Sequence, residues 1–136
     1  QQRQLLERKV EAMQSNTVVR LIGHDKAPAT LMHAADGLVI SSRREGFSYV
    51  LNEALMCDVN VLSTDVPVAN EVLPRGLIVP IDDAGALREK LTLLLQNQRE
   101  WTAQMQAAQA FAKQEMTVTQ MTKNTINHYQ GICQKT

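Results

Sequence analysis

Short apolar runs alternate with helical patterns through the first two thirds of the chain. Each run is brief, aliphatic or β-branched, and bounded by polar or turn-forming residues, as in buried strands. Four such runs are expected to form strands: residues 17–22, 37–40, 59–62 and 77–79. Helical spacing separates them, over residues 28–35, 47–55 and 67–73. This alternation predicts an α/β fold, a doubly wound parallel sheet of about four strands with flanking helices.

Helical patterns occupy both ends of the chain. Residues 4–13 predict an amphipathic helix, and Asp82-Asp83 are placed to cap another. The leucines of that second helix share one face: Leu87, Leu91, Leu94 and Leu95. Residues 99–115 and 117–133 are Gln-rich and helical in pattern, and Thr117 begins a capping-box sequence. No internal repeat or low-complexity linker divides the chain, whose 136 residues suit one domain.

The turn between the second strand and the next helix carries the candidate chemistry. The first N–H groups of a helix lack internal partners, and the helix dipole places partial positive charge there. Gly46 allows a ligand to approach the backbone, so the turn suits a phosphate. Glu45 and Glu53 flank it, and carboxylates accept hydrogen bonds from hydroxyl groups. A nucleotide sugar, with phosphates between two polyhydroxylated ends, fits better than ATP or an inorganic anion.

The same residues resemble a known signature. Glu45 and Glu53, with Gly46-Phe47 between them and Glu-Ala-Leu-Met-Cys closing the segment, resemble the E-x7-E motif of retaining GT-B glycosyltransferases, especially glycosyltransferase family 4. Further segments resemble that family's motifs in order: residues 18–23, 31–36 and 61–65, Glu71, and residues 77–80. The likeness extends over residues 16–95 and implies a Rossmann-like domain, the C-terminal half of a GT-B fold.

The resemblance implies a role for each residue of the turn. Glu45, the catalytic candidate, is expected to accept hydrogen bonds from hydroxyls of the donor sugar, and Glu53 from the ribose. Backbone N–H groups of three residues are expected to face the sugar: Gly46, Phe47 and Ser48. Those of Val50 and Leu51 are expected to bind the phosphates. Gly23 and His24 are expected to border the base, also at the carboxyl end of a strand, where ligands of parallel sheets bind.

The implied function is that of the donor-binding portion of a retaining glycosyltransferase of the hexosyltransferase type. A UDP- or GDP-sugar is the expected donor and substrate, and a glycan or lipid-linked acceptor, as in polysaccharide or lipopolysaccharide assembly, is the expected partner. The family stabilises its diphosphate leaving group with backbone amides, the helix dipole and basic side chains, so neither metal nor cofactor is expected. Consistently, the chain has no Asp-x-Asp sequence.

Two other functional classes stay open. The chain is also compatible with a non-catalytic α/β module for nucleotide binding or protein association, in which Glu45 and Glu53 are ordinary surface charges. A flavodoxin-like regulatory domain is a weaker alternative, because it needs an acidic pocket and Asp65 alone does not make one. Arg43 and Arg44 are interpreted as surface charge rather than donor contacts.

The chain departs from the family pattern in ways that predict incompleteness. Residues 1–115 are interpreted as an incomplete donor-binding domain, and residues 116–136 as its C-terminal helix. Two strands, an Arg/Lys loop and the N-terminal domain of the family are not recognisable, and the chain begins without Met. We expect a piece of a larger enzyme, inactive alone, or a sheet completed by rearrangement or by a second chain. Val68-Ala69 also stands before Glu71 where the family has Gly-Gly or Ser-Gly.

Composition narrows the partners and the location. The formal net charge is zero, from 14 basic and 14 acidic residues, so the chain lacks the basic surface typical of nucleic-acid or membrane-surface binding. Cys57 and Cys133 show no metal-ligand spacing, which favours a reducing cytoplasm. No apolar stretch approaches ~20 residues. The expected location is cytoplasmic, with peripheral attachment at the inner membrane face through the missing domain as an extension of that hypothesis.

Overall fold

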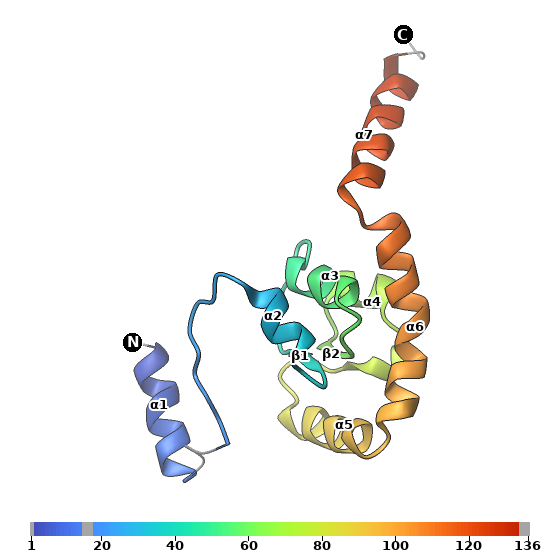
Figure 1. The fold of residues 1–136 in the computed structure, drawn as a ribbon. Helices are drawn as coiled ribbons and strands as arrows, with labels where there is room; N and C mark the ends of the chain where they lie inside the picture. Colours follow the sequence, from blue (N-terminus) through green and yellow to red (C-terminus); the bar gives the residue numbers. More distant parts are fainter. Residues whose placement is uncertain (1, 15–17, 134–136) are drawn as a thin grey trace.

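The computed structural model describes residues 2–14 and 18–133 and shows a small parallel sheet among helices (Figure 1). The strands are β1 (Leu38–Ile40), β2 (Val61–Thr64) and β3 (Ile78–Val79). The helices of the central body are α2 (Pro28–His33), α3 (Tyr49–Met56), α4 (Pro67–Val72), α5 (Ala84–Gln96) and α6 (Gln98–Glu115), with a 3-10 turn at Arg75–Leu77. Two further helices, α1 (Gln2–Ala12) and α7 (Val118–Cys133), form the ends. The α/β fold with a parallel sheet is therefore confirmed.

The sheet has the order β1-β2-β3, with both pairs parallel. Leu38 lies opposite Val61, and Ser63 lies opposite Ile78. All four residues of β2 are buried, as expected for the central strand of a sheet covered on both faces. Because the strands are parallel, their carboxyl ends lie at one edge, and the segments after β1 and β2 both begin there.

Helix α6 closes the core over the central strand. Trp101, 1% exposed, donates its indole N–H to the carbonyl of Val61 at 3.2 Å. Strand β3 pairs only with the end of β2, so the Trp101 indole supplies a partner that Val61 lacks in the sheet. Its ring also packs against Gly37, where a Cβ atom would lie 2.5 Å from the Trp101 Cη2 atom. Gly37 therefore allows β1 and α6 to approach.

The strand expected at residues 17–22 is not formed over the described residues 18–22, and Thr17 lies outside the described part. This segment runs from α1 to α2 apart from the sheet (Figure 1). Val18 and Ile22 are 82% and 66% exposed. A strand needs a neighbour that completes its hydrogen bonds, and no other strand of the described chain lies beside this segment. The described sheet therefore has three strands rather than about four.

The two terminal helices contribute no buried residue in the described chain. Helix α1 is tied to the following segment by Arg3, whose guanidinium donates to the Leu21 carbonyl at 3.1 Å. Helix α7 projects from the end of α6 (Figure 1), and the Thr117 hydroxyl accepts from the Gln120 amide at 3.1 Å. Only this half of the predicted capping box forms, since the Gln120 side chain donates to Asn124 instead.

Within residues 2–14 and 18–133, no helix combines the length and apolar character needed to cross a membrane.

Candidate functional site

The turn between β1 and α3 is held in place by two side-chain hydrogen bonds. The Thr64 hydroxyl, at the end of β2, donates to the Ser42 carbonyl at 2.6 Å. The Ser42 hydroxyl in turn donates to the Glu45 Oε1 atom at 2.6 Å. Glu45 is half-buried, and this bond fixes the direction of its carboxylate. Sequence reasoning assigned no role to Ser42 or Thr64, although two serines directly after a strand were a visible signal.

The start of α3 offers unpaired backbone donors. Ser48 is the N-cap residue, but its side chain makes no capping bond, and the first intrahelical bond runs from the Asn52 amide to the Ser48 carbonyl at 3.1 Å. The amides of residues 49–51 therefore have no acceptor inside the helix. No backbone bond recorded for the described residues uses them. Together with the helix dipole, these N–H groups favour an anion in front of the helix.

Gly46 opens the space before those amides. Its φ angle is not positive, and an added Cβ atom would meet no atom within 4 Å. Neither backbone conformation nor crowding inside the chain therefore explains a glycine here. Phe47 and Tyr49 are 51% and 73% exposed and meet edge to face, with ring centroids 5.2 Å apart. The side chains on either side of the N-cap are thus exposed, whereas Ser48 itself is 2% exposed.

A cavity of about 280 Å³ adjoins this turn. It lies between the turn, helix α4 and the end of α6. Its lining residues come from all three: Gly46, Phe47, Pro67, Val68, Glu71, Val72, Phe111 and Met116. A candidate binding residue, Gly46, and the Glu71 singled out from the sequence therefore border one cavity.

Glu45 and Glu53 lie on either side of the start of α3. Glu45 precedes α3, and Glu53 lies within the helix, on an exposed flank one turn after Tyr49. Val50 is half-buried and Leu51 is fully buried, so these two residues present backbone rather than side chains to a ligand at the helix start. The arrangement brings two kinds of group to one short helix: carboxylates that can accept hydrogen bonds from hydroxyls, and backbone N–H groups that can donate hydrogen bonds to an anion.

Basic side chains near the turn are differently engaged. The Arg43 Nε atom lies 2.7 Å from Asp82 Oδ1 in an exposed ion pair that joins the segments after β1 and β3. Arg44 is exposed and makes no ion pair in the described chain.

Gly23 has φ +77° and is exposed like His24, on the segment before α2. Neither Gly23 nor His24 lines the cavity at the turn, and their contact with a base stays a prediction.

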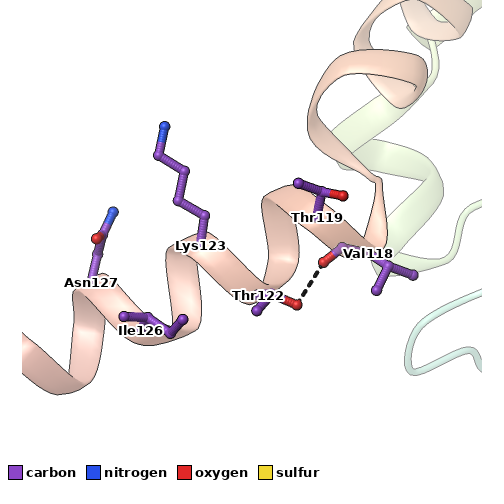
Figure 2. A pocket seen from close by; sticks show the side chains of 6 residues that line it. All are labelled: Val118, Thr119, Thr122, Lys123, Ile126 and Asn127. Atoms are coloured by element: carbon purple, nitrogen blue, oxygen red, sulfur yellow. Dashed lines mark hydrogen bonds between the residues drawn. The ribbon is translucent and has the colours of Figure 1, made fainter.

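A larger hollow of about 460 Å³ lies elsewhere, along α7 (Figure 2). Its lining comes from one helix: Val118, Thr119, Thr122, Lys123, Ile126 and Asn127. The Thr122 hydroxyl is occupied by a bond to the Val118 carbonyl at 2.8 Å. Since no other helix or strand among residues 2–14 and 18–133 contributes to this lining, the hollow is open rather than enclosed. In the part of the chain that the structure describes, no group of three His, Cys, Asp or Glu side chains is placed to hold a metal.

Comparison with known structures identifies the fold. Sucrose-phosphate synthase from Thermosynechococcus elongatus superposes with a TM-score of 0.84 at 20% sequence identity, over 99% of this chain and 35% of that one. Anabaena Alr3699/HepE in complex with UDP gives 0.86 at 19% identity, over 94% of this chain and 36% of that one. The same protein in complex with UDP-glucose gives 0.85 at 19% identity over the same shares. The likeness confirms a GT-B Rossmann-like domain, and the chain spans about a third of these structures.

Sequence comparison identifies the family. No significant match was found among curated proteins. A family profile described as glycosyl transferases group 1 matches residues 1–114, which include the turn, the cavity wall on α4 and most of α6. The chain therefore belongs to the glycosyl transferases group 1 family.

Proposed function

We propose that the chain is the donor-binding portion of a retaining, metal-independent glycosyltransferase. It takes a UDP- or GDP-sugar as donor and serves transfer to a glycan or lipid-linked acceptor. The observation that carries the proposal is the start of α3, where backbone amides without a hydrogen-bond acceptor follow Gly46. Neither the φ angle of Gly46 nor crowding around it explains why a glycine occupies this position. The structures of a protein with this fold in complex with UDP and with UDP-glucose support it.

The proposed roles follow the geometry of the turn. The amides at the helix start stabilise the diphosphate, whose charge grows as the bond to the sugar breaks, and this requires no metal. Glu45, oriented by Ser42, accepts hydrogen bonds from sugar hydroxyls beside the reacting carbon. Glu53, exposed on the flank of α3, accepts from the ribose hydroxyls. Gly23 and His24 approach the base.

Completion of the enzyme by a further domain or a second chain is part of the proposal. The Leu38 amide donates to Asn60, at 2.8 Å, so in a parallel register the N–H and C=O of Val39 point away from β2. That edge has no strand partner in the described chain. Apolar side chains of α7, among them Met121 and Tyr129, are also exposed. Transfer needs the partner that covers these surfaces, and this chain alone is inactive.

Calorimetric titration with UDP and GDP tests donor binding. The full-length natural protein is expected to bind one of them, and Glu53→Ala to weaken that binding by about tenfold to a hundredfold, because hydrogen bonds to a charged acceptor contribute about 1.5–3 kcal/mol. Glu89→Ala, which removes an exposed carboxylate on α5, is the matched control and is expected to bind normally. A folded protein that binds neither nucleotide would favour a protein-association module instead.

A further inference from the structure

We propose that the cavity beside Gly46 receives the acetamido group of a UDP-linked N-acetylhexosamine. The proposal rests on the donor-binding function above and names the substrate class of that site. The cavity adjoins the turn expected to face the donor sugar, since Gly46 and Phe47 form one of its walls. Its volume of about 280 Å³ lies near the lower end of small-ligand pockets, ~300 Å³, so it suits a sugar with its substituent and not a whole nucleotide.

The opposite wall of the cavity is mainly apolar. Helix α4 contributes Val68, which is 6% exposed, and Val72. The end of α6 contributes Phe111 and Met116. Phe111 is 47% exposed, so the wall stays partly open to water, but a sugar hydroxyl placed against buried Val68 would lose hydrogen bonds to water, which costs roughly 1–3 kcal/mol. At Val68 the wall therefore favours a methyl group over a hydroxyl.

One charged group interrupts this apolar wall. Glu71 is exposed and lines the cavity, and its side chain forms no hydrogen bond or ion pair with the described residues. A carboxylate accepts hydrogen bonds and donates none when ionised. An acetamido group combines an N–H donor for Glu71 with a methyl group for Val68 and Phe111. A hexose hydroxyl would satisfy only the first.

The space at Gly46 completes the fit. An added Cβ atom there would meet nothing within 4 Å, so the backbone of the turn is accessible from the cavity side. A sugar can lie against the turn while its substituent reaches α4. Val68 then determines specificity through its hydrocarbon surface, and Glu71 contributes affinity through its carboxylate.

Calorimetry on the full-length natural protein tests the proposal with UDP-N-acetylglucosamine and UDP-glucose, which share the nucleotide and differ in one substituent. The N-acetylated donor is expected to bind about tenfold more tightly, because both donors offer Glu71 a hydrogen bond but only the N-acetylated one adds a buried methyl group. Glu71→Ala is expected to weaken the binding of both UDP-sugars without changing the affinity for UDP. Val68→Thr, similar in shape but polar, is expected to reduce the ratio of the two affinities, and Glu89→Ala to preserve it.

Several outcomes would overturn the subsite. Equal affinity for the two donors, or tighter binding of UDP-glucose, would overturn the subsite. If the protein still binds UDP, that result leaves the proposed function intact. A ratio unchanged in Val68→Thr would overturn the subsite too, because the preference would then arise elsewhere. Binding of GDP but not UDP would also refute it, because the proposal names a UDP-linked donor. Binding of no nucleotide at all would remove the proposed function as well.

Discussion

Substitution of Gly46 by alanine separates folding from donor binding. The residue has no positive φ, and its Cβ would meet no atom within 4 Å, so the folded chain accommodates a methyl group without strain. Alanine also restricts the unfolded chain, and at such a position this stabilises a protein by about 0.4–1 kcal/mol. In the proposed donor site, the same methyl group would lie between the donor and the amides of α3. We expect donor affinity to fall by about tenfold, which corresponds to about 1.4 kcal/mol.

Two measurements on the same variant give this prediction its force, because they are expected to change in opposite directions. Urea unfolding should show Gly46→Ala to be at least as stable as the unmodified protein, while calorimetric titration with UDP or a UDP-sugar should show weaker binding. Gly131→Ala is the matched control, since its Cβ also meets open space, but on α7. Unchanged donor affinity in Gly46→Ala would refute the assignment of the turn, and marked destabilisation would refute the argument from open space.

Two further substitutions test the support of the site. Gly37→Ala places a Cβ 2.5 Å from the Cη2 atom of buried Trp101, and such overpacking is expected to lower the free energy of unfolding by about 1–3 kcal/mol. Urea unfolding followed by the fluorescence of the chain's one tryptophan measures this change, and an unchanged midpoint would contradict the contact. Ser42→Ala removes the 2.6 Å bond that orients Glu45, so donor affinity should fall by roughly fivefold, about 1 kcal/mol. Ser41→Ala, which changes an exposed neighbour, is the control and is expected to bind the donor normally. Equal affinities in the two variants would show that the Ser42 bond does not position Glu45 for the donor.

Local sequence signals predicted the elements well where local interactions form them. Asp83 accepts from the Ala86 amide at 2.8 Å, as its position before a helical pattern predicted. Leu87, Leu91 and Leu94 face the body of the protein, although Leu95, on the edge of the same stripe, is exposed. The turn from Glu45 to α3 was placed correctly because a strand pattern ends and a helical pattern begins there.

Features that depend on distant residues were not accessible in the same way. The bond from Thr64 to Ser42 joins positions 22 apart, and no periodicity in the sequence indicates it. The cavity joins Gly46 to Phe111, which lie on separate elements brought together by the packing of α3 on α6. The segment at residues 18–22 has the composition of a strand, but strand formation requires a neighbouring strand as well as composition. These differences share one cause, which is that pairing and packing depend on the tertiary arrangement.

The distribution of burial explains why binding and transfer should depend on different parts of the enzyme. The turn, α4 and α6 surround one core that includes Leu51, Leu55 and Met105, all fully buried, so the proposed donor site is organised by this chain itself. Helices α1 and α7 bury nothing in the described chain, and helices of this length gain most of their stability from packing. We propose that their apolar faces acquire that packing from a partner. In the proposed enzyme this partner supplies the acceptor site, so that donor binding and transfer depend on different surfaces of the chain.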